Sequence, residues 1–341
     1  AMNRAEVLVR RLDRLQRRHV VLAFPFAVAQ KFGNDQAGAK AALIAYYGLF
    51  ALFPLLLLLA TILGFVLTGH PGLQRRVLAS ALANIPIIGN QLRGSTHGLR
   101  GSGLALAIGI AGTIYGAQGV GEAAQNAMNS IWNIPYKNWP SFLQRHGRAF
   151  LILAVLGLGT IVSTALTGFA AQIVHGVPAR VGSVAISIAV NLGVFYTAFT
   201  VLTGESLGWR DVGPGVVLAT LFWEVLQALG GFYVRHALVH ANEVYGFFGI
   251  VIGLLSWLYV GAELTLLAAE INVVLRYRLW PRSMTQPPFT EQDKATFLRL
   301  ARMTERRPEM SVSASFAPEA DRQPLVEHTT AQRRPDRRHG T

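Results

Sequence analysis

The stretch "YYGLFALFPLLLLLATILGF", residues 46–65, decides the class of fold. It has no charged residue, five consecutive leucines and one proline, Pro54. Such a stretch can be a core helix of a soluble protein, a transmembrane helix, or two short helices broken at the proline. The charge-free run that contains it extends from Ala41 to Gln74. That run is longer than the roughly 20 residues that a helix needs to cross about 30 Å of hydrocarbon.

The rest of the chain repeats this pattern. Asp, Glu, Lys and Arg are also absent from residues 101–121, 149–179 and 181–204. Hydrophobic residues make up 52% of the sequence and charged residues 14%, whereas a soluble domain carries about 25% charged residues. A soluble core would also need a polar face on most of these helices. The sequence therefore predicts an all-α protein that crosses a membrane several times.

We expect six transmembrane helices. Pro54 removes one backbone hydrogen bond, and neighbouring helices can satisfy the freed carbonyl, so we expect it to kink the first helix rather than end it. The predicted spans are residues 43–68, 102–120, 148–173, 182–202, 215–236 and 246–276.

The basic residues predict the orientation of these spans. With a cytoplasmic N-terminus, 25 of the 31 Lys and Arg residues lie on the cytoplasmic side and six on the other side. Cytoplasmic loops carry the excess of Lys and Arg, so both termini are expected in the cytoplasm. The chain then divides into a cytoplasmic interfacial segment (1–40), a six-helix transmembrane domain (41–280) and a basic cytoplasmic tail (281–341).

The N-terminal segment has the pattern of a helix that lies on a membrane surface. Val7, Leu8, Leu12 and Leu15 share one helical face, with arginines around them. Basic charge beside membrane spans favours contact with anionic lipid rather than with nucleic acid. The arginines expected to contact lipid are Arg10, Arg11, Arg14, Arg17 and Arg18.

The C-terminal tail is rich in Pro, Arg and Glu from Ser283 onward. A short helix is expected after Thr290, because Asp293 stands three residues later, in the position of a capping box. We expect most of the tail, and above all its last 30 or so residues, to be disordered.

A polar stripe follows the second predicted span in "GAQGVGEAAQNAMNSIWNIP". Its members recur at helical spacings of three and four, so they lie on one face of an otherwise apolar helix. Such a face must meet a partner helix, a cavity or the membrane interface. The stripe is either a wall of a polar substrate path or a set of hydrogen bonds between helices. Its candidate residues are Gln118, Glu122, Gln125, Asn126 and Asn129.

Three acidic residues fall within the last two spans. Placing a charged side chain at mid-membrane costs on the order of 3 kcal/mol of free energy, so each acid is expected to have a structural or functional role. Glu224 and Glu263 either line a cavity or proton-linked site, or are neutral acids that join helices. Glu270 lies nearer the inner surface, beside Arg276, which favours a structural role. Asn191 in the fourth span is a candidate partner for this group.

Other searches restrict the chemistry. The chain has no cysteine, which excludes thiol catalysis and thiolate metal sites. It has no phosphate-binding loop, no G-x-S-x-G and no H-E-x-x-H motif, so we expect neither an enzyme nor a cofactor. His236, His240 and Glu243 have helical metal-ligand spacing, but solvated histidines are commoner at an interface, and no metal site is assigned.

Small residues provide a further pattern. Gly112 and Gly116 stand four apart, as in helix pairs whose backbones approach closely. Such glycine faces serve contacts within one chain and between chains alike, so a homo-oligomer is one arrangement that they permit.

Four segments together resemble the YihY/BrkB family: "AALIAYYGLFALFPLLLLL", "NSIWNIP", "LGWRDVGPGVVLATLFWEVL" and "YGFFGIVIGLLSWLYVGAELTLLAAEINVVL". The resemblance covers roughly residues 30–280. It implies a six-helix bacterial inner-membrane protein with cytoplasmic ends, tied to envelope integrity and, for BrkB, to virulence. Some members are suspected of carrying lipids or other envelope components. The family long bore the label ribonuclease BN, and no catalytic residues of it can be carried over to this sequence.

Three functions are compatible with these patterns. The leading hypothesis is a non-enzymatic membrane protein that moves, or helps to move, a lipid or amphipathic envelope component. The alternative is a membrane scaffold whose polar groups only join helices and whose tail recruits a partner. The remote alternative is the inherited ribonuclease activity.

Overall fold

The computed structural model describes residues 13–66, 103–173, 177–236, 238–285 and 288–316. Regular structure within these residues is helical, which confirms the predicted all-α class for them. The helices are α2 (Val20–Asn34), α3 (Ala37–Val66), α6 (Gly103–Ile131), the 3-10 turn η1 (Tyr136–Asn138), α7 (Phe142–Ile173), α8 (Val177–Val201), α9 (Trp209–His236), α10 (Leu238–Tyr277) and α11 (Glu291–Arg302).

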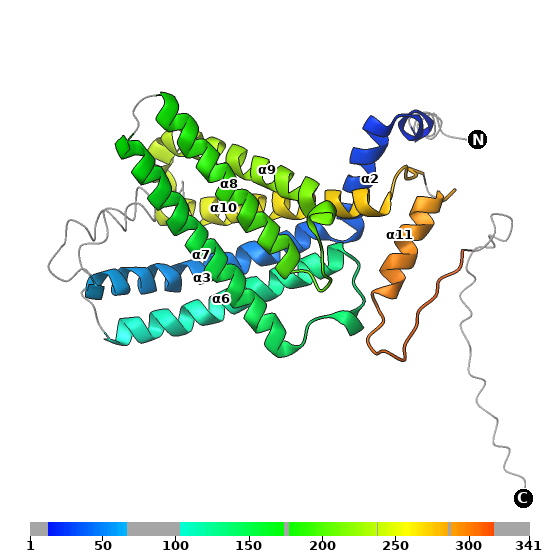
Figure 1. Cartoon of the computed structure of the whole chain (residues 1–341), viewed down its shortest axis with the longest axis horizontal. Helices are drawn as coiled ribbons and strands as arrows, with labels where there is room; N and C mark the ends of the chain where they lie inside the picture. The colour runs from blue at the N-terminus through cyan, green and yellow to red at the C-terminus, as the bar shows by residue number, and fades with distance from the viewer. Residues whose placement is uncertain (1–12, 67–102, 174–176, 237, 286–287, 317–341) are drawn as a thin grey trace, which may run out of the picture.

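Among the described residues, six long helices form the bundle. Helices α3, α6 and α10 run along its long axis, while α7 and α8 cross them at an angle (Figure 1). The short helices α2 and α11 lie together at one end, beside the C-terminal ends of α6 and α10 (Figure 1). We call this the basal end. Each long helix overlaps one of the six predicted spans, and no span extends more than two residues beyond its helix.

Pro54 lies inside α3, which continues without a break on both sides of it. The prediction that this proline does not end the helix is therefore confirmed. Its ring packs against α6 at Gly112, where a Cβ atom would lie only 2.7 Å from Cβ of Pro54. Gly116 meets Ala51 in the same way, at 2.6 Å. The two glycines thus allow the close approach of α3 and α6 that their spacing predicts.

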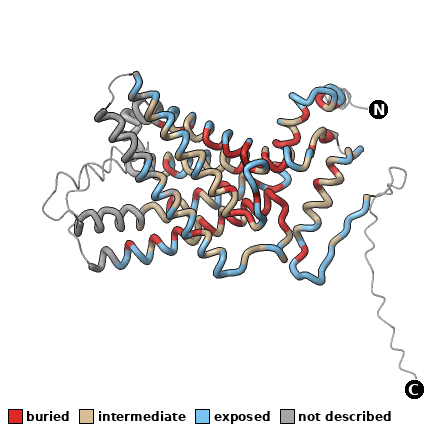
Figure 2. The backbone as a smooth tube through the Cα atoms, viewed as in Figure 1, coloured by how far each residue is buried: buried red, intermediate tan, exposed pale blue. Residues whose placement is uncertain are grey.

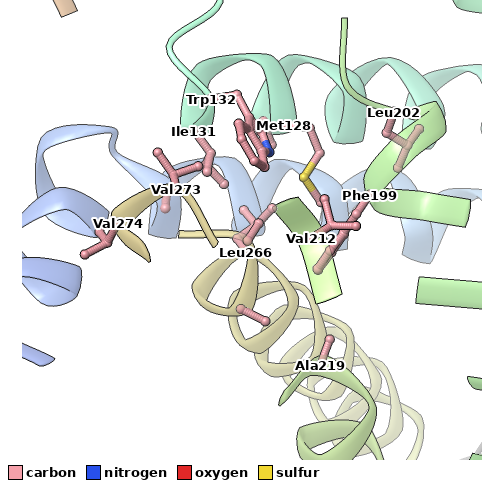
Figure 3. Packing of buried hydrophobic residues seen from close by; sticks show 14 of the residues in the cluster. Met128, Ile131, Trp132, Phe199, Leu202, Val212, Ala219, Leu266, Val273 and Val274 are labelled. Carbon is pink, nitrogen blue, oxygen red and sulfur yellow. The ribbon is translucent and has the colours of Figure 1, made fainter. Parts of the chain in front are cut away.

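Buried residues concentrate toward the basal end (Figure 2). There the end of α6 meets the ends of α8 and α10 and the start of α9. Met128 from α6 and Trp132, directly after this helix, pack with Phe199 from α8 and Leu266 from α10, and all four are almost completely buried (Figure 3). This core holds the four helices in one arrangement.

The outer surface of the bundle is apolar. Phe50, Ile108, Leu158, Leu221 and Leu229 lie on four different helices, and each exposes more than half of its surface. Soluble monomers rarely present such extensive apolar surface. Within the described residues, three segments are long and apolar enough to cross a membrane. They are Val181–Val201, Trp209–Gly230 and Val251–Tyr277.

Several helices extend beyond the predicted spans. Helix α9 begins at Trp209 instead of residue 215, because the carboxylate of Asp211 accepts the backbone N–H of Gly208 at 3.0 Å and caps the first turn. Helix α6 continues to Ile131 and so carries the whole polar stripe. Hydropathy marks only the part of a helix that faces hydrocarbon, so it misses these polar ends.

The predicted capping box of α11 is confirmed. The Thr290 hydroxyl accepts the N–H of Asp293 at 3.1 Å, and the Asp293 carboxylate accepts the N–H of Thr290 at 2.9 Å. The same carboxylate accepts Nε of Arg282 at 2.9 Å, with both side chains fully buried. The start of the tail is therefore an ordered part of the basal end.

The prediction of a largely disordered unit from residue 281 is not confirmed for residues 281–285 and 288–316. Tyr136 and Lys137 donate their backbone N–H groups to the carbonyls of Met303 and Glu305, at 3.2 and 2.9 Å. These bonds join the tail to the α6–α7 connection. Residues 317–341, to which the prediction also applies, lie outside the described residues.

Candidate functional site

Glu224 lies between α8 and α9 and is bonded to neutral groups. Its Oε1 accepts the Ser187 hydroxyl at 2.8 Å and the Asn191 amide at 2.9 Å. The predicted partnership of Asn191 and Glu224 is thus confirmed. Both donors stand one turn apart on α8, since residues four apart share a helical face. No base pairs with this carboxyl group among the described residues.

Glu263 lies on another side of the bundle. Its Oε1 accepts the hydroxyl of Tyr259, one turn earlier on α10, at 3.3 Å. Gly38, at the start of α3, faces this pair, because a Cβ there would lie 3.9 Å from Oε1 of Glu263. Glu224 therefore faces α8 while Glu263 faces α3, and the structure does not bring the two acids together in one cluster.

The polar stripe of α6 bonds to its neighbours at the basal end. Oδ1 of Asn129 accepts the N–H of Gly204, after α8, at 2.7 Å. Nε2 of Gln125 donates to the Arg145 carbonyl at 2.9 Å. The Arg145 guanidinium in turn donates to Asn126 at 3.2 Å and lies 3.9 Å from Glu122.

For two of the five residues of the stripe, these contacts bear on the two roles that the sequence left open. Gln125 and Asn129 are buried and hold α6 to α7 and to the α8–α9 connection. Glu122 and Asn126 are half-buried and face Arg145. Gln118 is half-buried. Helix joining thus accounts for Gln125 and Asn129.

Glu270 belongs to a buried ionic cluster that connects α2 with α10. Nζ of Lys31 lies 2.9 Å from Oε2 of Glu270, and both side chains are fully buried. Lys31 also pairs with Asp35, one turn later, and donates to the Ile131 carbonyl at 2.6 Å. The ion pair with Glu270 rests on charge rather than on a well-directed hydrogen bond.

The neighbouring charges determine the protonation state of Lys31. Burial by itself lowers the pKa of Lys31, but the carboxylates of Glu270 and Asp35 outweigh this effect and raise the pKa above its ordinary value. Lys31 therefore remains a cation inside the protein. Lys40 extends the cluster, because its Nζ donates to the carbonyl of Asp35. Two cations then face two carboxylates, so the cluster as a whole is close to neutral.

The sequence-based assignment of partners was wrong for Glu270. Arg276, expected beside it, pairs instead with Asp211 at the start of α9. Six residues separate Arg276 from Glu270, so on a helix with 3.6 residues per turn they point to different faces. Lys31 was missed because it stands in a basic segment where charge suggests solvent or lipid contact. Its spacing of four from Asp35 is the one local signal of the pair.

The predicted lipid-contact arginines divide into three groups. Arg14 and Arg18 are exposed, beside the exposed apolar side chains Leu15, Val20 and Val21. Arg17 is engaged within the protein, with Asp13 at 2.6 Å and with Ser283. Arg10 and Arg11 lie outside the described residues, as do Val7, Leu8 and Leu12.

The tail makes one further charged contact with the bundle. Nζ of Lys137 lies 2.7 Å from Oε2 of Glu305. The hydrogen bond from Lys137, together with one from the Val312 N–H at 3.0 Å, holds the pKa of Glu305 below its ordinary value. Arg299 also lies over the ring of Tyr277 at the end of α10, 3.3 Å from its centre. Electrostatic contacts therefore fasten the tail to the basal end.

A cavity of about 80 Å³ lies between α3, α6 and α7. Its lining is almost entirely apolar and includes Ala117, Ala124, Ile152 and Leu153. Thr113 supplies a hydroxyl that has no hydrogen-bond partner among the described residues. None of the predicted site residues lines this cavity.

No metal centre can be assembled from the described residues, since no three His, Cys, Asp or Glu side chains gather there. The side chains of His236, His240 and Glu243 lie outside the described set. The site residues of this chain are thus ionisable and amide groups that bond to one another.

Three known proteins are similar in sequence to this chain. The chain is 26% identical over 273 residues to YfkH of Bacillus subtilis, a protein described as ribonuclease-like, with 75% of this chain and 96% of that protein covered. It is 26% identical over 310 residues to the inner membrane protein YhjD of Escherichia coli, with 83% and 90% covered. A UPF0761 membrane protein of Alcanivorax borkumensis is also 26% identical, over 265 residues, with 74% of this chain and 60% of that protein covered.

No solved structure matches the chain. The profile of one protein family, described as Virulence factor BrkB, matches residues 28–293. That match spans all six long helices of the described residues in full and all but the first eight residues of α2. With its apolar exterior and its relatives among membrane proteins, the chain is an integral membrane protein that belongs to the BrkB family.

Proposed function

We propose that this protein moves, or helps to move, a lipid or another amphipathic envelope component across the bacterial inner membrane. It acts without covalent chemistry, as six transmembrane helices with both ends in the cytoplasm. The basal end, with α2, α11 and most basic residues, faces the cytoplasm. This orientation follows from the excess of Lys and Arg on that side.

The observation that carries the proposal is the environment of Glu224. A carboxyl group within a membrane span is costly, and such groups mark substrate or ion paths. Here the carboxyl group accepts hydrogen bonds from Ser187 and Asn191 and has no basic partner among the described residues. Glu263, bonded to Tyr259, has a similar neutral partner on the other side of α10.

The N-terminal segment supports a site of action at the membrane surface. Arg14 and Arg18 are exposed next to Leu15, Val20 and Val21. A helix with adjacent basic and apolar surface binds an anionic leaflet, and each basic residue contributes about 1 kcal/mol. We propose that this surface, with Arg10, Arg11 and Arg17 in the same segment, rests on the cytoplasmic leaflet.

Reconstituted vesicles test the proposal directly. Wild-type protein is expected to move a fluorescent phospholipid between leaflets faster than empty vesicles do. Glu224→Leu and Glu263→Leu are each expected to slow this movement about tenfold, equivalent to roughly 1.4 kcal/mol of barrier. Glu205→Gln is the matched control, because Glu205 is exposed in the α8–α9 connection.

The outcomes separate the parts of the proposal. No movement above that of empty vesicles would reject lipid transport. Movement that is equal in wild type, Glu224→Leu and Glu263→Leu would reject the two acids as path residues. Glu224→Gln keeps the hydrogen-bonding shape but cannot titrate, so slow movement in this variant would assign the role to a proton.

A scaffold role is the second candidate, and the docked tail favours it. Glu305 of the tail pairs with Lys137 of the bundle, and a scaffold would recruit its cytoplasmic partner through the remainder of the tail. Removal of residues 317–341 tests this role without breaking this contact. A scaffold is expected to lose its cellular function in that truncation, whereas a carrier is expected to keep transport in vesicles.

RNA processing is the remote alternative, and it rests on the description of YfkH as ribonuclease-like. It would require that purified protein trims a tRNA precursor and that a point substitution in this chain abolishes the trimming.

A further inference from the structure

We infer that the cavity between α3, α6 and α7 binds one acyl chain of an anionic phospholipid, with the lipid phosphate at Arg145. This inference rests on the proposed function, because it names the lipid class and the place on the protein where that lipid is held. The argument comes from the shape and chemistry of the cavity and from the charges at its end.

The cavity opens toward the membrane. Val120 of α6 and Ile152 and Leu153 of α7 line it and are only half-buried, so it reaches the outer surface between these two helices. The neighbouring outward-facing side chains, Ile114 and Leu151, are exposed and apolar. A hydrocarbon chain can therefore enter sideways from the bilayer without crossing a polar surface.

The lining favours hydrocarbon over water. A volume of about 80 Å³ would hold two or three water molecules. A buried water needs two to four polar partners, however, and empty apolar cavities stay dry. Thr113 offers a single hydroxyl, which bonds to no described residue. An alkyl chain fills such a space with van der Waals contacts and needs no hydrogen bond.

Small residues create the space. Ala117, Gly121 and Ala124 follow one another along the α6 side of the cavity, with Ala149 opposite on α7. From Thr113 to Ala124 the lining extends about 16 Å along α6, at 1.5 Å per residue. That length suits an extended part of one acyl chain lying parallel to the helix.

Positive charge lies at the basal end of the same cavity. Two lining residues mark this end of the cavity: Ala124, which Gln125 follows, and Ala149, which Arg148 precedes. Arg145 lies one turn earlier on α7, with 27% of its side chain exposed; it donates to Asn126 at 3.2 Å and lies 3.9 Å from Glu122. Arg148 donates to the Thr203 carbonyl at 2.8 Å. Two cations against one carboxylate favour an anionic headgroup at this end.

Photo-crosslinking tests the site. The probe is phosphatidylglycerol with a diazirine in its acyl chain, mixed into vesicles of phosphatidylethanolamine and phosphatidylglycerol that contain the wild-type protein. Mass spectrometry is expected to locate the adducts on the cavity-lining residues of α6 and α7. Labelling spread evenly over the exposed apolar residues would overturn the inference.

Two matched variants control for general lipid contact. Ala117→Leu fills the cavity and is expected to remove most of the labelling there. Ala111→Leu makes the same change on an exposed face of α6 and is expected to leave it unchanged. Equal labelling in both variants would contradict the inference. Thermal unfolding of each variant shows whether the protein is folded. If Ala117→Leu does not fold, Ile152→Phe is used in its place to fill the cavity.

Two further variants identify the occupant. Arg145→Gln is expected to lower labelling by phosphatidylglycerol about fivefold, since one basic residue contributes about 1 kcal/mol to binding an anionic lipid. An unchanged level would remove Arg145 from the site. Thr113→Val keeps the shape and is expected to retain the labelling. Loss in this variant would show a polar ligand and overturn the assignment of an acyl chain.

The experiment is independent of transport. Labelling is measured at equilibrium, without any requirement for movement between leaflets. A labelled cavity in a protein that moves no lipid would reject the proposed function and keep the site. Transport without cavity labelling would keep the proposed function and reject the site.

Discussion

Lys31 makes the most consequential single contact at the basal end. It is fully buried, yet it carries a charge that Asp35 and Glu270 balance. A buried charge pair gains little over an apolar pair of the same shape, but loss of one partner leaves an uncompensated charge. The cluster therefore specifies how α2 sits against α10 more than it adds to stability.

Removal of this cation is expected to be costly. Lys31→Met leaves two buried carboxyl groups without their counter-ion, and we expect it to lower the free energy of unfolding by about 3–5 kcal/mol. Unfolding of the protein in a mild detergent measures the loss. Lys294→Met is the control, since Lys294 forms an exposed pair with Glu291 and such a pair contributes roughly 0–1 kcal/mol. Similar losses in the two variants would contradict the role of the cluster.

The pH dependence gives the same prediction a second measurement. The folded-state pKa of Lys31 is raised above its ordinary value of 10.5. The stabilisation is therefore fully present below pH 10.5 and is lost as the pH rises through the higher folded-state pKa. Wild-type protein is expected to lose stability in this alkaline range more steeply than Lys31→Met does.

At the scale of helices, glycines determine which pairs approach closely. Gly121 of α6 faces α7, and a Cβ there would lie 2.2 Å from Cβ and 2.9 Å from Cα of Ala149. The helices would have to separate to accommodate it. Gly121→Ala is expected to lower the unfolding free energy by about 1–3 kcal/mol, the usual cost of overpacking.

Gly157 offers the matched control on α7. Nothing lies within 4 Å of a Cβ placed there. Gly157→Ala is expected to raise the stability by up to about 1 kcal/mol, because alanine favours a helix over glycine. Thermal unfolding of both variants in one detergent measures the difference. If both changes were neutral, close packing of α6 on α7 would not depend on Gly121.

Sequence patterns predicted the helices better than the contacts between them. Each long helix of the described residues matches one predicted span to within two residues or extends beyond it, because charge-free length is a local property. Asn191 was also predicted as a partner for the acids, since polar groups inside apolar helices must find partners, whereas Tyr259 was not singled out. The contact between Lys31 and Glu270 was not predicted, because it depends on how α2 packs against α10 in the folded protein. The ordered start of the tail was missed for the same reason.

At the scale of the whole molecule, the basal end joins segments from both ends of the chain. Asp13 accepts the N–H of Met284 at 2.8 Å, and Phe24 packs edge-on against Trp280 at 5.4 Å between ring centres. The tail then reaches the α6–α7 connection through Glu305. These contacts place α2, α11 and that connection on one side, which requires an even number of membrane crossings between the two short helices.

Cysteine labelling tests this topology, and the chain has no native cysteine to interfere. Pro178→Cys, Ser141→Cys and Glu291→Cys each place one thiol at an exposed position. Pro178 lies at the start of α8, at the opposite end of the bundle from α11 (Figure 1). An impermeant thiol reagent applied to intact spheroplasts is expected to label Pro178→Cys alone. Ser141→Cys and Glu291→Cys are expected to react only after the membrane is opened, because most Lys and Arg residues lie on their side.

External labelling of Glu291→Cys together with protection of Pro178→Cys would reverse the orientation. Labelling of Ser141→Cys and Glu291→Cys from different sides would break the six-span topology itself.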